Sequence, residues 1–264
     1  PLVIPSYIGA LTYISAFSPK GLFVQIFNRY GIEEIAGIEG FLGSWLVLTL
    51  FTYPYVQLIC SSALRNLDST VEDAARSLGV NQFKVYTSVV IPRLKKPIIY
   101  SSLLVGLYVI SDFGAVSLMR YSTVTKAIYA YYELSILSDP VIFYSSLLIV
   151  LALLISFIQR GSATSRSAKV SGTPRIPKKV RLERNGKVLV YSFLGGIIFL
   201  GLIIPVAVLG FWLFRGLYYG TDLTSSIPGI LGSFSASIVT SILAIVISMP
   251  IVILISQYKS RFGD

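Results

Sequence analysis

Residues 69–92 read S-T-V-E-D-A-A-R-S-L-G-V-N-Q-F-K-V-Y-T-S-V-V-I-P, the longest run rich in charged and helix-forming residues in an otherwise apolar chain. Ser69 and Glu72 have the spacing of a capping box, which predicts a helix that begins near Thr70. Gly79 predicts the end of this helix after about nine residues. The segment is therefore expected to form a short helix outside the hydrocarbon.

One face of this predicted helix is apolar, and its small alanine side chains allow another surface to come close to the backbone. Residues at i, i+3, i+4 and i+7 form the stripe, namely Val71, Ala74, Ala75 and Leu78. Asn81 is expected to cap a second short helix that Pro92 ends, because proline disfavours helical geometry in the residue before it. The residues alone leave two interpretations open: both helices pack on the chain's own bundle, or the stripe binds another protein.

Composition indicates an integral membrane protein. The chain has 264 residues, of which 54% are hydrophobic and 13% charged, and the mean hydropathy is +0.76. Histidine is absent, and Cys60 is the single cysteine, which excludes a His-based catalytic triad, a His-ligated zinc site and a disulfide framework. No G-x-x-x-x-G-K-[ST] pattern occurs, so any ATP hydrolysis would belong to a partner. No catalytic residue, metal or cofactor is expected.

Charge-free runs predict the membrane spans, because a charge near the bilayer centre is costly and about 20 apolar residues cross the hydrocarbon. We expect an all-α, polytopic helical bundle with about six spans, at residues 1–19, 40–64, 97–119, 140–159 and 188–214 and within 223–258. The last run would measure about 54 Å as a helix, so it is expected to begin as an interfacial segment at 226–232. Within it Ser233, Ser237 and Ser241 predict a small-residue packing face, and Pro205 and Pro250 are expected to kink their helices or mark boundaries.

The basic residues are distributed unevenly between the loops. Of 22 Lys and Arg residues, 17 lie in the loop after the second span, in the segment 160–187 or in the C-terminal tail. The positive-inside rule therefore predicts that these segments and both chain ends are cytoplasmic. Segment 160–187 is rich in Ser, Gly, Pro and Lys, which is typical of a linker that contacts anionic lipid. A nucleic-acid-binding arm is disfavoured because no aromatic residues interleave the charges.

Residues 73–92 resemble the EAA loop of binding-protein-dependent ABC importer permeases, whose pattern is E-A-A, three residues, Gly, nine residues and I-x-L-P. Here the pattern is Asp73-Ala74-Ala75, three residues, Gly79, nine residues and V-V-I-P ending at Pro92. The departures are Asp for Glu, Val for Ile and Ile for Leu. The resemblance implies that Glu72, Asp73, Ala74, Ala75, Leu78, Gly79 and Pro92 form the helix and turns that dock on the ATPase subunit.

A second resemblance concerns the region after this loop. The stretch D-F-G-A at 112–115, followed by T-V-T-K-A-I-Y at 123–129, is similar to permeases for ferric iron and thiamine, which carry two fused repeats. We therefore expect the later part of one repeat with the EAA loop at 1–160, a cytoplasmic basic linker at 161–186 and the first part of a second repeat at 187–264. The chain is then an internal fragment of a longer permease.

Asp112 is the one acidic residue within a predicted span, about 22 Å from that span's cytoplasmic end. Such a group must be solvated, paired or facing a cavity. Two interpretations stay open: the carboxylate caps a helix near Phe113 and Gly114 or meets water at the outer interface, or it lines the substrate path.

The resemblance implies a type I ABC importer permease of the MetI-like fold in the cell membrane of a prokaryote. Its partners would be a cytoplasmic ABC ATPase dimer, an extracytoplasmic substrate-binding protein and the lipid membrane, but no nucleic acid. Ferric iron is the substrate that the resemblance favours, with thiamine, a polyamine or another small solute as alternatives. An ATP-independent channel or secondary carrier would need ionisable residues in several spans, where this sequence has only Asp112. A membrane enzyme is disfavoured because the sequence has no histidine and no carboxylate pair inside the spans.

Overall fold

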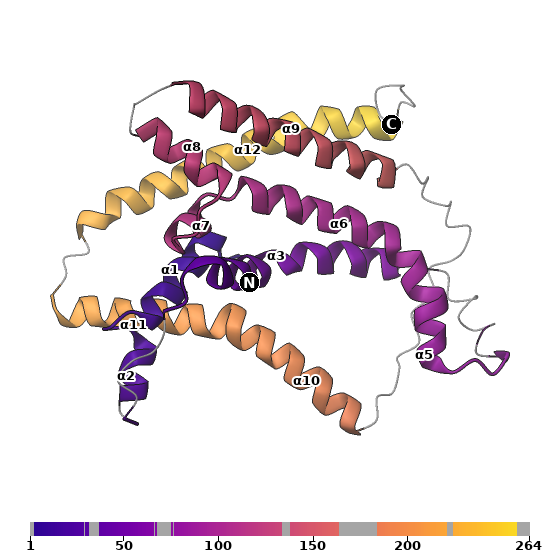
Figure 1. Cartoon of the computed structure of the whole chain (residues 1–264), viewed down its shortest axis with the longest axis horizontal. Helices are drawn as coiled ribbons and strands as arrows, with labels where there is room; N and C mark the ends of the chain where they lie inside the picture. The colour runs from indigo at the N-terminus through magenta and orange to yellow at the C-terminus, as the bar shows by residue number, and fades with distance from the viewer. Residues whose placement is uncertain are drawn as a thin grey trace. The chain divides into compact units, whose positions relative to one another are not determined.

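Figure 1 shows the computed structural model of the chain. Its described secondary structure consists of α-helices with two short π turns and one short 3-10 turn. The residues that the structure describes are 3–28, 30–31, 37–65, 67, 75, 77–133, 138–163, 184–220 and 224–257. Within these ranges there is no strand, which confirms the predicted all-α class.

Five helical runs in the described part are long and apolar enough to cross a membrane. They correspond to the second to sixth spans expected from the sequence. Their elements are α3 (Gly40–Arg65), α6 (Ile91–Ser111) with α5 (Gln82–Val85) and η1 (Tyr86–Val90) before it, α9 (Ser138–Ala163), α10 (Arg184–Ile198) continued by η2 (Phe199–Ile203) and α11 (Ile204–Tyr218), and α12 (Ile227–Gln257).

The first expected span, at 1–19, is shorter than predicted. Helix α1 (Ser6–Phe17) has 12 residues, which rise about 18 Å against a hydrocarbon thickness of about 30 Å. Ser18 ends the helix in an extended conformation (ψ 157°), because the following Pro19 excludes helical geometry there. The chain then turns into α2 (Leu22–Asn28).

Helix α1 is the buried centre of the first of two compact units, residues 1–210. It packs against α3 and the short helix α7 (Gly114–Leu118). A Cβ atom at Gly9 would overlap the ring of Phe51 on α3, so a glycine is needed where the two helices meet. The buried cluster comprises Ala10, Tyr13, Ala16, Val47, Leu48, Phe51, Ala115, Val116, Met119, Ile204 and Val208. Small side chains on α1 thus allow the close helix packing that membrane bundles require.

The remaining helices of this unit surround that centre. Helix α6 packs against both α3 and α9, and α9 also packs against α8 (Val124–Glu133). The basic segment predicted at 161–186 lies almost wholly outside the described residues. The first compact unit extends to residue 210, because η2 and the start of α11 pack with α1 and α3. The division into two repeats near residue 187 stays a prediction.

The second unit, residues 211–264, contains the end of α11, the 3-10 turn η3 (Thr224–Ser226) and α12. Helix α12 has 31 residues and would measure about 46 Å. It is continuous through residues 226–232 and through Pro250, so no break separates the expected interfacial segment from the span. Side chains from Ile227 to Leu254 are exposed within the chain.

The prediction that Pro92 ends a helix is wrong, because the helix continues from Gln82 to Ser111. The π turn η1 directly precedes Ile91 and Pro92, and the amide of Ile91 bonds to the carbonyl of Tyr86. A proline inside a helix lacks an amide and its ring clashes with the carbonyl four residues earlier. The wider π turn relieves that clash, and the same arrangement precedes Pro205, where η2 ends at Ile203.

Candidate functional site

The short helix predicted from residue 70 ends as its sequence indicates. Ala75 and Ser77 are helical, and Gly79 takes the left-handed conformation with φ +77°. The amide of Val80 donates to the carbonyl of Ala75 at 3.2 Å. This is the six-to-one hydrogen bond of a Schellman motif, which satisfies a carbonyl that the helix end would otherwise leave unpaired.

The exposed part of this segment is its C-terminal end. Leu78 is 83% exposed and Ala75 is half-buried. Packing on the chain's own bundle is therefore not observed for Leu78. Glu72, Asp73 and Ala74 lie outside the described residues, so the first part of the predicted docking stripe stays a prediction.

The helix that follows joins this turn directly to the membrane bundle. The carbonyl of Asn81 accepts a hydrogen bond from the amide of Val85, so a helix begins at the position predicted for its cap. Large apolar side chains and cations are exposed on its first turns: Phe83, Lys84, Tyr86, Ile91, Arg93, Lys95 and Lys96. Pro92 is exposed on the same stretch. A force applied to the Gly79 turn would thus act on one continuous helix that enters the bundle at α3 and α9.

Asp112 follows the last residue of α6 and joins three helices. Its Oδ1 accepts a hydrogen bond from the amide of Ala115 at 2.9 Å, which caps α7. Its Oδ2 accepts the hydroxyl of Ser6 on α1 at 2.6 Å. Its backbone carbonyl accepts the hydroxyl of Thr125 on α8 at 3.0 Å. The capping role expected near Phe113 and Gly114 is therefore observed.

The position of Asp112 along its helix differs from the one counted from the sequence. Because the helix begins at Gln82 rather than near residue 97, Asp112 lies about 45 Å from its start. The carboxylate is thus at the opposite end of the helix from the Gly79 turn. Asp112 is half-buried, and both of its oxygens accept hydrogen bonds from the chain.

A mostly apolar cavity of about 230 Å³ lies beside α3, α6 and α7. This cavity is not predictable from local sequence, because its lining comes from separate segments: Phe41, Ser44, Trp45, Leu48, Thr49, Thr52, Val105, Val109, Val116, Tyr121 and Thr123. The hydroxyls of Ser44 and Thr52 donate to carbonyls of their own helix, those of Gly40 and Leu48. These two hydroxyls are therefore satisfied within α3.

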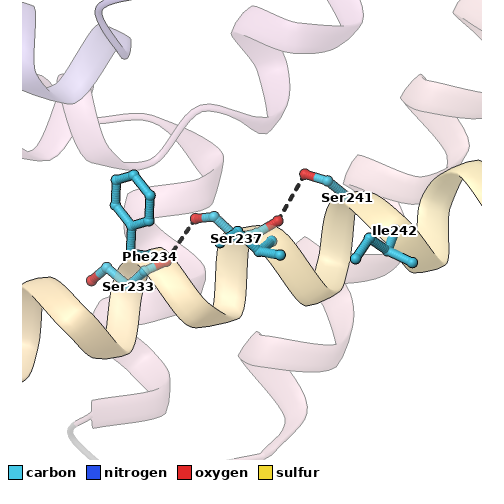
Figure 2. Close-up of a pocket in the computed structure, with 6 residues that line it drawn as sticks. Ser233, Phe234, Ser237, Ser241 and Ile242 are labelled. Atoms are coloured by element: carbon cyan, nitrogen blue, oxygen red, sulfur yellow. Dashed lines mark hydrogen bonds between the residues drawn. The ribbon is translucent and has the colours of Figure 1, made fainter.

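An open groove runs along α12 at the predicted small-residue face. Figure 2 shows Ser233, Ser237 and Ser241 one turn apart on the helix, with Phe234 and Ile242 beside them. The hydroxyl of Ser237 donates to the carbonyl of Ser233, and that of Ser241 to the carbonyl of Ser237, both at 2.7 Å. These donors are satisfied within the helix, so the face can lie in hydrocarbon or against another helix.

The described residues contain no group of three or more His, Cys, Asp or Glu side chains that could hold a metal ion.

Comparison with known proteins identifies the family. Residues 2–165 match the family described as "Binding-protein-dependent transport system inner membrane component". This range includes the turn at Gly79, the helix from Gln82 to Ser111 and the Asp112 junction. No solved structure gives a significant match.

Relatives with curated descriptions include permeases of different transport systems. The chain is 28% identical to the Fe(3+)-transport system permease protein FbpB 2 of Haemophilus influenzae, over 98% of this chain and 49% of that protein. It is 34% identical to the putrescine transport system permease protein PotI of Escherichia coli, over 39% of this chain and 34% of that protein. It is 25% identical to the sulfate transport system permease protein CysW of Synechocystis, over 48% of this chain and 45% of that protein.

The chain spans about half or less of the length of these relatives. The family match, however, covers well over half of this chain and includes its buried centre. The chain therefore belongs to the family of binding-protein-dependent transport system inner membrane components.

Proposed function

We propose that this chain is part of the permease subunit of an ATP-driven ABC importer. A separate pair of cytoplasmic ATPase subunits would supply the energy, and an extracytoplasmic binding protein would deliver the substrate. Family membership supports this proposal. These 264 residues contain no G-x-x-x-x-G-K-[ST] phosphate-binding loop, so the proposal assigns ATP hydrolysis to the partner.

The coupling element of this proposal is the helix that ends at Gly79. The observation that carries it is the exposed Leu78 on a Schellman-capped turn that leads directly into the helix from Gln82 to Ser111. Leu78 and Ala75 would enter a groove of the ATPase. Glu72 and Asp73 would favour the positive end of the helix dipole and pair with basic ATPase groups, and Gly79 and Pro92 would set the turns on either side.

Ala75→Arg tests this role in the full-length protein, expressed with its ATPase and binding protein. The long charged side chain would block a close approach to the helix, so ATP-coupled uptake should fall at least about tenfold, the equivalent of 1.4 kcal/mol of lost coupling. Insertion and the amount of protein in the membrane should not change. Ala75→Ser, which keeps the side chain small, is the matched control. Unchanged uptake in Ala75→Arg would remove the coupling role.

Ferric iron is the substrate that we propose to test first. The similarity to the Fe(3+) permease extends over 98% of this chain, whereas the sulfate and putrescine permeases match less than half of it. Thiamine and polyamines are the alternatives. Uptake of radiolabelled iron, putrescine and sulfate by the reconstituted system would decide among them, and iron uptake without added ATP would favour a channel or secondary carrier instead.

Asp112 is proposed to border the translocation path. It lies at the end of the helix opposite to the Gly79 turn, at a junction of α1, α7 and α8. A carboxylate at that end could attract a cation leaving a binding protein, while its hydrogen bonds hold the three helices together.

A further inference from the structure

A hydrogen bond joins helix α1 to a membrane span whose residue lies 187 positions further along the sequence. The hydroxyl of Tyr13 on α1 donates to the carbonyl of Leu200 in the π turn η2, at 2.8 Å. Tyr13 is 2% exposed, although it carries a polar group. The two residues lie on opposite sides of the basic segment 160–187.

The helix itself offers no donor to the Leu200 carbonyl. In the π turn, the amide of Ile204 bonds to the carbonyl of Phe199. The next amide, which would reach Leu200, belongs to position 205, and this position is proline. Because proline has no N–H group, the carbonyl needs a partner from elsewhere.

Water cannot easily be that partner. Leu200 lies near the middle of the apolar run from Arg184 to Tyr218, about 24 Å from Arg184 and about 27 Å from Tyr218 along the helix axis. Gly201, Ile204 and Val208 around it are buried in the same unit as Tyr13. A backbone group at this depth must be satisfied by protein, because the hydrocarbon offers no donor.

We infer that Tyr13 is a positioning residue, whose hydroxyl replaces the amide that Pro205 lacks and holds α1 against the π turn of the neighbouring span. The bond is made by a side chain across a helix interface. It can therefore be broken and remade when the two helices move, whereas an intrahelical hydrogen bond would not report on their relative position. In an importer, the bond would favour the state in which α1 and α11 are packed together. This role in transport rests on the proposed function.

A double-mutant cycle on the full-length protein tests this inference. Thermal unfolding in detergent would be measured for the wild type, Tyr13→Phe, Pro205→Ala and the double variant. Tyr13→Phe should lower the unfolding midpoint by about 2–4 °C. In the Pro205→Ala background the same change should have less than about half of that effect, because the new amide of residue 205 can satisfy the carbonyl. Equal shifts in both backgrounds would overturn the inference.

Two matched controls separate this bond from general loss of a hydroxyl or a proline. Tyr7→Phe removes a hydroxyl from the same helix, at a side chain that is 50% exposed, and should not shift the midpoint. Pro97→Ala removes a proline from within α6 and should leave the full effect of Tyr13→Phe. If Tyr13→Phe fails to accumulate, Pro205→Ala should restore accumulation, and failure to do so would also overturn the inference.

Uptake by the complete transporter addresses the mechanical role. Tyr13→Phe should reduce uptake about fivefold, and Pro205→Ala should reduce this loss. If the double-mutant cycle shows the expected coupling but Tyr13→Phe transports normally, the role in transport is overturned, whereas the role of Tyr13 as hydrogen-bond donor to Leu200 stands. If the wild-type complex does not transport at all, the proposed function fails, whereas the unfolding cycle still decides whether Tyr13 substitutes for the missing amide.

Discussion

Asp112 shows how one side chain serves two chemical demands in this bundle. Its two carboxylate oxygens accept hydrogen bonds from the amide of Ala115 and the hydroxyl of Ser6, so it caps α7 and fixes α1 at the same time. The hydroxyl of Ser6 is also 3.0 Å from that of Tyr108. These hydrogen bonds are enough to explain why Asp112 is needed, whether or not its negative charge has a role. The effect of the charge can be tested only with a substitution that keeps the hydrogen bonds.

Asp112→Asn and Asp112→Ala separate these two roles. Asparagine caps helices as well as aspartate does, and its amide NH2 can donate to the Ser6 hydroxyl, which then donates to the hydroxyl of Tyr108. Asp112→Asn should therefore change the free energy of unfolding by less than about 0.5 kcal/mol, whereas Asp112→Ala should cost about 1–2 kcal/mol. If the charge attracts substrate, uptake should fall in both variants. Denaturation curves and uptake would be compared, and normal uptake by a stable Asp112→Asn protein would leave only the capping role.

At the scale of elements, the chain repeats one device for placing proline inside a membrane helix. Each of the π turns η1 and η2 is followed directly by isoleucine and proline, at Pro92 and at Pro205. The wide turn adds about one residue to the helix and so rotates what precedes it by about 100° relative to a regular α-helix. At Pro92 this rotation sets the direction in which the turn at Gly79 presents Leu78.

Pro92→Ala should therefore affect coupling more than stability. With an amide restored at residue 92, the π turn can relax to a regular α-helix, which should leave the unfolding midpoint unchanged or raise it by about 1–3 °C. The same relaxation should rotate the Gly79 turn away from its partner, so ATP-coupled uptake should fall. Pro97→Ala, five residues further along the same helix, is the control and should retain uptake. Retained uptake in Pro92→Ala would mean that the π turn does not set this direction.

At the scale of the whole molecule, the proposed orientation in the membrane rests on where the cations lie. The segments with 17 of the 22 basic residues alternate with those that hold the other five, which supports the proposal that the Gly79 turn is cytoplasmic. In this topology Leu78, which is 83% exposed, would lie on the cytoplasmic side, and Tyr132 on α8, which is 71% exposed, would lie on the outer side.

Cysteine labelling tests this orientation after serine replaces Cys60, the single cysteine of these 264 residues, and any cysteine elsewhere in the full-length protein. In cells that lack the ATPase subunit, so that position 78 is not covered, a membrane-impermeant maleimide should label Leu78→Cys in inside-out vesicles but not in intact cells, because the label cannot cross the bilayer. Tyr132→Cys should show the reverse pattern. Labelling of Leu78→Cys in intact cells would contradict the proposed topology and, with it, docking on a cytoplasmic ATPase.

Most of the helices follow from local sequence. A membrane span must be apolar over about 20 residues and must satisfy its own backbone, so the spans at α3, α9 and α12 can be located from charge-free runs. Gly79 ends its helix because a left-handed residue is a local requirement. The short α1 was missed although Pro19 carried the signal for its end, and the continuation through Pro92 was missed because a π turn has no clear sequence signature.

The amino-acid sequence by itself determined the all-α class, the apolar spans, the capped turn at Gly79 and the family pattern, because each depends on neighbouring residues and on the bilayer as solvent. The tertiary structure decided what Asp112 and Tyr13 bond to, since Ser6 and Leu200 are 106 and 187 positions away from them. Helix packing decides which groups meet at such separations, so the position of a hydroxyl or carboxylate in the sequence does not predict its hydrogen-bond partner.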